Sequence, residues 1–143
     1  YEQAVDYFNQ AIAREPQNPE FYGKRGLARS LEEQGLTEAA VVAYKKASAL
    51  APRASQPHQF LGALYYRKRR LSEAIVEYEK AVQLGDFGYY TLIPLCQSYD
   101  RLGRYRPAIA CYQEVLARFP NDTLATRQLA HMQRNIKNRA VQG

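Results

Sequence analysis

Few side chains of this sequence have the types and spacing that catalysis or metal binding needs. His58 and His131 are the only histidines, and neither has a cysteine or carboxylate partner at metal-ligand spacing. The sequence contains no glycine-rich phosphate loop and no nucleophile elbow. We therefore predict a protein that is not an enzyme, with no catalytic residue, no metal site, no cofactor and no small-molecule substrate.

The two cysteines, Cys96 and Cys111, match no metal-binding spacing. Two cysteines alone also cannot build the disulfide framework that small secreted domains use. We expect both to be reduced thiols that pack as small hydrophobic side chains.

The charge balance is basic, with 20 Lys and Arg against 14 Asp and Glu. Such a surplus favours acidic partners, and it serves solubility equally well. The densest cluster is Arg67, Lys68, Arg69 and Arg70, the basic turn. We expect these charges to be solvated at a turn between helices. The alternative is contact with nucleic-acid phosphates or an anionic membrane, which four basic residues without a recognised motif support only weakly.

Length and composition indicate one globular domain, with 143 residues of which 46% are hydrophobic. No apolar run approaches the roughly 18–20 residues that span a bilayer, and no signal peptide is recognisable. The sequence starts at Tyr1 inside a predicted helix, so we interpret it as a piece of a longer protein. Its compartment stays open, with the cytoplasm as the default.

One pattern recurs along the whole chain at a spacing of about 34 residues. An alanine is followed four residues later by an aromatic residue and seven residues later by a small or β-branched one. The alanines are Ala4, Ala40, Ala74 and Ala108, the aromatics Phe8, Tyr44, Tyr78 and Tyr112, and the third set Ala11, Ala47, Ala81 and Val115. Positions i, i+4 and i+7 share one helical face, so each copy predicts an amphipathic helix.

A second series predicts the partner of each of these helices. Its leucines precede a small residue, which lets two helix backbones approach closely. The pairs are Leu27-Ala28, Leu61-Gly62, Leu95-Cys96 and Leu129-Ala130. Because one helical hairpin cannot bury its own apolar face, neighbouring hairpins must stack.

Proline and glycine divide the pattern into eight expected helices. Pro16, Pro52 and Pro120 follow second helices, which proline ends, and Gly35 and Gly103 mark hairpin turns. The expected helices are 1–14, 20–34, 37–50, 56–69, 72–84, 91–102, 105–118 and 122–138. We expect the sixth to begin late, near Thr91, so that Pro94 falls in its first turn.

These residues resemble the tetratricopeptide repeat family over nearly the whole chain, in four mutually consistent copies. The resemblance implies an all-α, right-handed superhelical solenoid of antiparallel helix hairpins. Three residues depart from the family pattern: Arg69 replaces a turn glycine, Asp86 replaces a terminal proline, and Pro94 stands where a helix interior is expected. We expect one domain, 1–143, made of a truncated repeat (1–18), repeats 19–54, 55–88 and 89–122, and a capping helix and tail (123–143).

The resemblance implies that the first helices of the hairpins line a concave groove that binds peptides. Helical spacing from the core leucines predicts the residues that face it: Tyr22, Arg25, Arg29, Gln56, Gln59, Tyr66, Tyr90, Ile93, Gln97, Arg127, His131 and Arg134. Arginine forks, amides and tyrosines suit a peptide or protein segment that carries acidic residues. The alternative is that they are solvated polar residues of a spacer.

Family members that clamp the C-terminal carboxylate of chaperones use Lys, Asn and Arg at defined groove positions. The matching positions of this sequence hold Arg25, Arg29, Phe60, Tyr90 and Pro94. We therefore expect that this clamp is absent.

The favoured function is a non-enzymatic scaffold or adaptor for protein complex assembly. One alternative is a basic module that contacts nucleic acid or membrane. Another is a structural, self-associating segment, because the helix with Ala4, Phe8 and Ala11 lacks a preceding partner helix and leaves an apolar face open. That face also predicts a homo-oligomer or further repeats upstream.

Overall fold

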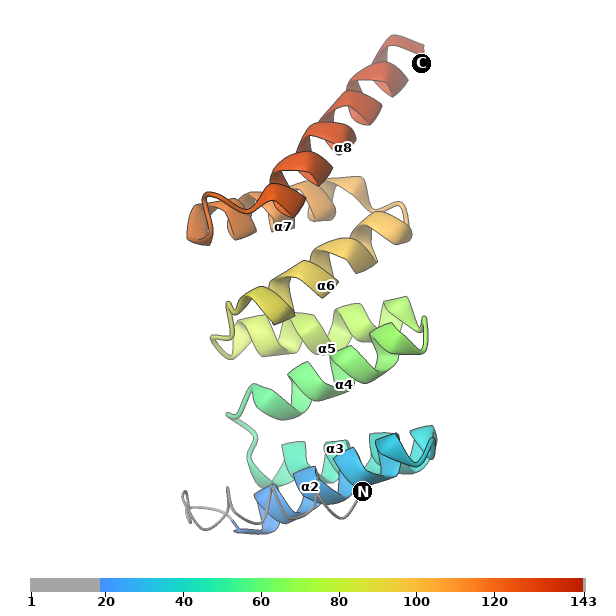
Figure 1. The fold of residues 1–143 in the computed structure, drawn as a ribbon, viewed down its shortest axis with the longest axis vertical. Coiled ribbons are helices and arrows are strands. Elements are labelled where there is room, and N and C mark those ends of the chain that lie inside the picture. The colour runs from blue at the N-terminus through green and yellow to red at the C-terminus, as the bar shows by residue number, and fades with distance from the viewer. Residues whose placement is uncertain (1–18, 143) are drawn as a thin grey trace.

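The computed structural model describes residues 19–142, and side chains from residue 26 to residue 137. The described part contains seven helices: α2 (Pro19–Glu33), α3 (Thr37–Leu50), α4 (Gln56–Arg67), α5 (Leu71–Gln83), α6 (Tyr89–Arg101), α7 (Tyr105–Arg118) and α8 (Thr123–Gln142). They stack in chain order along the long axis of the molecule (Figure 1). Helix 1–14 and the open N-terminal face lie outside the described residues. Within them, no helix is long and apolar enough to cross a membrane.

The seven helices form three antiparallel hairpins and a terminal helix. α2 packs with α3, α4 with α5 and α6 with α7, and each second helix contacts the first helix of the next hairpin. The hairpin turns close in the same way, with a backbone N–H bonded to the carbonyl five residues earlier, as from Leu36 to Leu31 and from Arg104 to Tyr99, both 2.9 Å. The residue before each of these donors is Gly35 or Gly103, at φ 79° and 74°. Glycine suits this left-handed conformation because it has no Cβ.

The repeating alanines and aromatics form the core, as predicted. Tyr44, Tyr78 and Tyr112 are at most 1% exposed, and the alanines beside them are fully buried. Leu61 and Leu95 are buried as well, but Leu27 is 46% exposed. Since α2 packs mainly on α3, its face with Leu27 has no described neighbour.

Helix α6 begins earlier than predicted, so the expected placement of Pro94 is wrong. The helix starts at Tyr89 and Pro94 lies inside it. Asp86 fixes this start, because one carboxylate oxygen accepts from the Gly88 N–H (3.0 Å) and the other from the Thr91 hydroxyl (2.6 Å). Pro94 cannot donate to the carbonyl of residue 90, which belongs to the exposed Tyr90 near the helix start.

Helix α8 is longer than predicted and ends the stack. It runs to Gln142, beyond the expected end at 138, and projects away from α7 (Figure 1). The Asp122 carboxylate accepts the Ala125 N–H at 2.8 Å, which caps its first turn. Ala125 and Met132 are buried, whereas most other described residues of α8 are polar and exposed.

The prediction of two reduced cysteines is wrong, because Cys96 and Cys111 form a disulfide. The S–S distance is 2.17 Å and the Cα atoms are 5.3 Å apart. The bond joins α6 to α7, with Cys96 at the small position after Leu95 and Cys111 beside Tyr112. Cys111 Sγ also lies 3.5 Å from the Leu92 carbonyl oxygen, which is a van der Waals contact because a disulfide sulfur carries no proton.

Candidate functional site

The predicted groove residues lie on the first helices of the hairpins and on α8. Arg29 is on α2, Gln56, Gln59 and Tyr66 on α4, Tyr90, Ile93 and Gln97 on α6, and Arg127, His131 and Arg134 on α8. Tyr22 and Arg25 also belong to α2, but their side chains lie outside the described residues. We call the surface of these first helices and α8 the first-helix face.

Tyr66 and Gln97 meet at the centre of the first-helix face. The Tyr66 hydroxyl donates to Gln97 Oε1 at 2.8 Å, across the boundary between two repeats. The Arg101 guanidinium lies 5.2 Å from the centre of the Tyr66 ring. Both side chains of the hydrogen bond are partly exposed, so this tyrosine, amide and guanidinium together offer a ring surface and polar groups to a ligand.

Towards α2 the same face carries a partly buried carboxylate. Glu32 accepts from the Tyr44 hydroxyl at 3.0 Å and pairs with Arg67, which extends from the basic turn. The Glu32 side chain is 12% exposed, and burial lowers the pKa of Arg67. Arg29 is more exposed and pairs with Glu33 at 3.2 Å along α2. Glu32 therefore holds two repeats together, and Arg29 stays available to solvent.

The remaining predicted groove residues divide into exposed and buried ones. Tyr90 is 79% exposed, with its ring edge-on to Tyr89 at 5.6 Å between centroids. Ile93 is only 7% exposed and packs in the core of the third hairpin, so its assignment as a groove residue is wrong. Arg127, His131 and Arg134 are exposed on α8.

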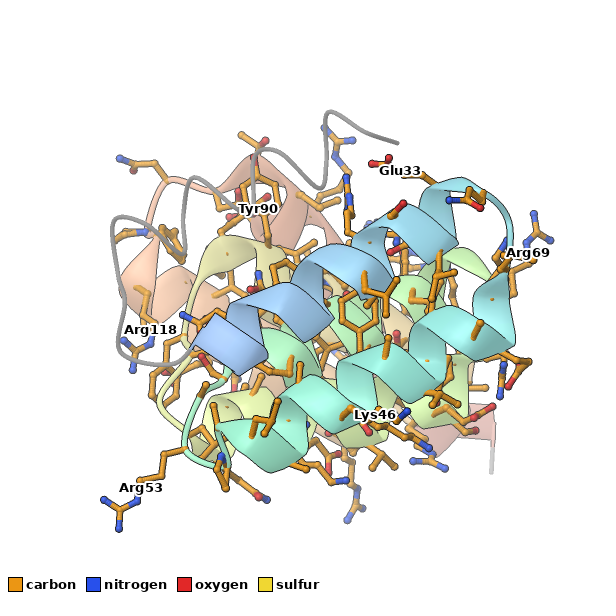
Figure 2. All side chains as sticks on the ribbon, turned by 90° about the horizontal axis from the view of Figure 1, so that it is seen from below. Glu33, Lys46, Arg53, Arg69, Tyr90 and Arg118 are labelled. Atoms are coloured by element: carbon orange, nitrogen blue, oxygen red, sulfur yellow. A yellow bond between two sulfur atoms is a disulfide. The ribbon has the colours of Figure 1, made fainter. Side chains whose placement is uncertain are left out.

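The basic turn is only half available for a ligand. Arg67 pairs with Glu32, and Arg70 pairs with Glu38 at 2.6 Å and Glu73 at 2.7 Å. The hydrogen bond from Arg70 lowers the pKa of the Glu73 carboxyl. Lys68 and Arg69 are exposed and have no ion-pair partner among residues 26–137. Figure 2 shows Arg69 at the edge of the stack, pointing away from the helices.

Arg69 adopts the left-handed conformation that the other two hairpin turns give to glycine. Its φ is 60°, and it is the one non-glycine residue with positive φ among those described. An L-residue is disfavoured there by about 1–2 kcal/mol. We expect Arg69→Gly to raise the free energy of unfolding by about 1 kcal/mol, measured by urea denaturation. Lys68→Gly, at φ −87°, is the control that removes a charge without relieving this strain, and an equal gain from it would contradict the explanation.

One polar cluster was not predicted from the sequence, in which His58 has no carboxylate partner at metal-ligand spacing. Glu77 is 7% exposed, and its Oε2 lies 2.8 Å from His58 Nδ1. Ser48 Oγ lies 3.2 Å from His58 Nε2. In the 34-residue register, His58 and Glu77 stand where the next repeat has the apolar Leu92 and Cys111, which marks both positions as unusual but does not pair them.

The order Ser48, His58, Glu77 is that of a nucleophile, a base and an orienting carboxylate. Acyl transfer would also need N–H groups that stabilise an oxyanion. Ser48 lies inside α3, where its backbone N–H is part of the helical hydrogen-bond ladder. We therefore interpret the cluster as a polar link between α3, α4 and α5. Among the described residues, no group of three or more His, Cys, Asp or Glu could hold a metal ion.

Stacked antiparallel hairpins with this alanine–aromatic core define a helical-repeat protein. Two sequence models described as tetratricopeptide repeat match the chain, one over residues 25–88 and one over residues 97–122. The chain belongs to the tetratricopeptide repeat family, whose fold is typically non-catalytic. No curated protein matches the sequence significantly.

Solved structures of the same fold are similar over most of the chain. The first tetratricopeptide domain of Spaghetti (RPAP3), bound to the HSP90 peptide SRMEEVD, has a TM-score of 0.72 and 18% identity, over 85% of this chain and 96% of that chain. MamA of AMB-1 has a TM-score of 0.77 and 20% identity, over 96% and 74%. YrrB, described as having an unusual peptide-binding site, has a TM-score of 0.73 and 24% identity, over 90% and 65%. At these identities the likeness establishes the fold.

Proposed function

We propose that this chain is a protein–protein interaction scaffold that binds a peptide or protein segment on its first-helix face. The observation that carries the proposal is the Tyr66–Gln97 pair beneath Arg101, which joins two repeats and stays accessible. Tyrosine offers a large contact area with few rotatable bonds, and amides hydrogen-bond an extended backbone. Two similar structures support this use of the fold, since one holds an HSP90 peptide and the other is described by its peptide-binding site.

The ligand we propose is an extended segment with acidic residues. Arg29 lies at one end of the first-helix face, and Arg127 and Arg134 lie at the other. Exposed arginines bind carboxylates in a bidentate manner. At the positions that correspond to the chaperone clamp, Phe60, Tyr90 and Pro94 offer no cation, so we propose that the ligand is held along its length and not by a clamped terminal carboxylate.

The test is an affinity pull-down from lysate of the source cells with the chain as bait. The groove variant is Arg29→Glu with Arg127→Glu, and the matched control is Arg53→Glu with Arg106→Glu, two exposed arginines of a loop and a second helix. We expect partners that the parent and the control retain and that the groove variant loses at least about tenfold. If the groove variant retrieves the same partners as the control, the proposal is wrong.

The basic turn is a less favoured ligand site than the first-helix face. Two of its four residues, Arg67 and Arg70, are occupied by Glu32, Glu38 and Glu73. Nucleic-acid affinity that falls steeply with salt and disappears in Lys68→Glu, Arg69→Glu would favour that alternative over the groove.

A further inference from the structure

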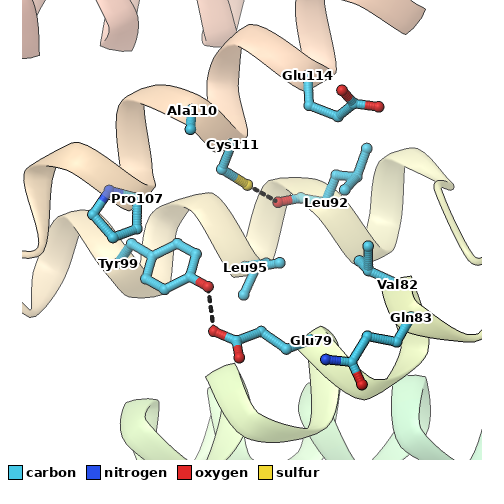
Figure 3. Close-up of a pocket in the computed structure, with 10 residues that line it drawn as sticks. All are labelled: Glu79, Val82, Gln83, Leu92, Leu95, Tyr99, Pro107, Ala110, Cys111 and Glu114. Atoms are coloured by element: carbon cyan, nitrogen blue, oxygen red, sulfur yellow. Dashed lines mark hydrogen bonds between the residues drawn. The ribbon is translucent and has the colours of Figure 1, made fainter.

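A pocket lies on the opposite side of the third hairpin from the first-helix face. It opens between the second helices α5 and α7, with α6 as its floor (Figure 3). Its volume is about 450 Å³, which lies within the usual range of ligand sites. Val82, Leu92, Leu95, Ala110 and Cys111 provide an apolar lining, and Glu79 and Glu114 contribute carboxylates.

The same place one repeat earlier holds three polar side chains of the chain itself. In the 34-residue register, Val82, Leu92 and Cys111 correspond to Ser48, His58 and Glu77. Those three polar side chains hydrogen-bond to one another between α3, α4 and α5. In the later repeat the interior positions are apolar, and the space between the helices stays open. The side chains that line this place therefore differ in polarity between the two repeats.

The charges around the two places are opposite. Glu79 and Glu114 correspond to Lys45 and Lys80 of the earlier repeat. Glu79 accepts a hydrogen bond from the Tyr99 hydroxyl and has no cationic partner among residues 26–137. Glu114 pairs with Arg118 at 2.6 Å, but both side chains are more than two-fifths exposed, and such a pair exchanges readily with another cation. In a chain of net charge +6, this pocket is a locally acidic site.

We propose that this pocket binds a segment of a partner protein in which a large apolar side chain stands next to Lys or Arg. The apolar side chain fills the space over Leu92 and Leu95. The neighbouring cations pair with Glu79, on α5, and with Glu114, on α7. This ligand has the opposite charge to the acidic segment proposed for the first-helix face, so the two surfaces select different partners.

The test uses nuclear magnetic resonance of the whole 15N-labelled chain, kept oxidised, titrated with three matched peptides. The first is acetyl-Gly-Lys-Phe-Lys-Gly-amide, the second replaces both Lys by Glu, and the third replaces Phe by Ala. We expect saturable shifts of the Val82, Leu92 and Ala110 amides with the first peptide. We expect at least about tenfold weaker binding of the alanine peptide, which lacks the apolar group, and no shifts with the Glu peptide.

Two variants separate the pocket from other basic-peptide sites. Ala110→Phe fills the pocket from an exposed position, and Val76→Phe introduces the same ring at the exposed corresponding position of the earlier repeat. We expect Ala110→Phe to lower the affinity at least about tenfold and Val76→Phe to leave it unchanged. Glu79→Gln with Glu114→Gln should lower it about two- to fivefold.

The proposal fails if the Lys-Phe-Lys peptide shifts no pocket amide at millimolar concentration. It also fails if the shifts appear only around Gln97, if the Glu peptide binds equally well, or if both phenylalanine variants behave alike. Each of these results leaves the pull-down on the first-helix face unaffected, so the two proposals stand or fall separately.

Discussion

Reduction of the Cys96–Cys111 disulfide is expected to lower the free energy of unfolding by about 3 kcal/mol. The bond closes a loop with a sequence separation of 15, and a cross-link of that length restricts the unfolded chain by about this amount. It also joins α6 and α7, so its loss should loosen the third hairpin first. Urea denaturation of the oxidised chain, with and without a phosphine reductant, measures the difference.

The control for this experiment is the Cys96→Ala, Cys111→Ala variant, whose unfolding midpoint should not respond to the reductant. Thiol alkylation followed by mass spectrometry reports whether the bond is present before each measurement. Equal midpoints for chains shown to be oxidised and reduced would contradict the expected effect. Hydrogen exchange that accelerates mainly in residues 89–118 on reduction would locate the effect in the third hairpin.

Gly62→Leu is expected to destabilise the second hairpin by about 3 kcal/mol or more. A Cβ at residue 62 would lie 2.9 Å from three ring atoms of Tyr78, which is 1% exposed and has no space to move. Overfilling a packed core costs about 1–3 kcal/mol for a few methylene groups, and here the backbones of α4 and α5 must separate. Gly62→Ala should cost about 1–2 kcal/mol, because alanine's better helix propensity offsets part of the clash.

A double-mutant cycle between Gly62 and Tyr78 tests whether the Tyr78 ring causes the destabilisation. In a Tyr78→Leu background, which leaves space beside residue 62, Gly62→Ala should become neutral or stabilising. Chemical denaturation of the four chains of this double-mutant cycle gives the interaction energy. Additive effects would mean that the Tyr78 ring is not what excludes a side chain at this position.

The sequence predicted the helices well because the core pattern repeats four times. Ala40, Ala74 and Ala108, with the aromatic residue that follows each, set the register of the second helices, and all three helices are present. The turn positions were predicted from Gly35 and Gly103, because glycine tolerates the left-handed conformation that ends a helix. Arg69 occupies the same conformation, so the backbone geometry of the hairpin outweighs the local preference of one residue.

What was not predicted depends on contacts between particular side chains of different helices or on caps of a single copy. The start of α6 is set by Asp86, whose carboxylate bonds Gly88 and Thr91, and no periodic pattern reports such a cap. The disulfide required knowing that the small position of α6 faces residue 111 of α7. A spacing rule for metal sites or secreted domains contains no such information.

The candidate site was predicted in part. Tyr66 and Gln97 were both assigned to the groove, and they meet across two repeats. Ile93 was placed there by its spacing from Leu95, but it is buried in the core of the third hairpin. The polar link through His58 was missed because Glu77 lies 19 positions further along the chain, on another helix. Neither pattern nor spacing predicts that two such side chains meet.

The interface between α3, α4 and α5 and the interface between α5, α6 and α7 are lined by different side chains. This difference limits how the repeats of this chain could be rearranged. One interface encloses Ser48, His58 and Glu77, and the other encloses an apolar pocket beside a disulfide. Exchanging segments 55–88 and 89–122 would set Leu92 against Ser48 and His58 against Leu116, which stands 34 residues after Val82. His58 would keep Glu77 but face an apolar side chain in place of Ser48, and Ser48 would lose its hydrogen-bond partner. The repeats therefore share a backbone fold, but the side chains at each boundary match only their own neighbour. We expect a duplication or exchange of repeats to preserve stability only when the helices on both sides of a boundary are moved together.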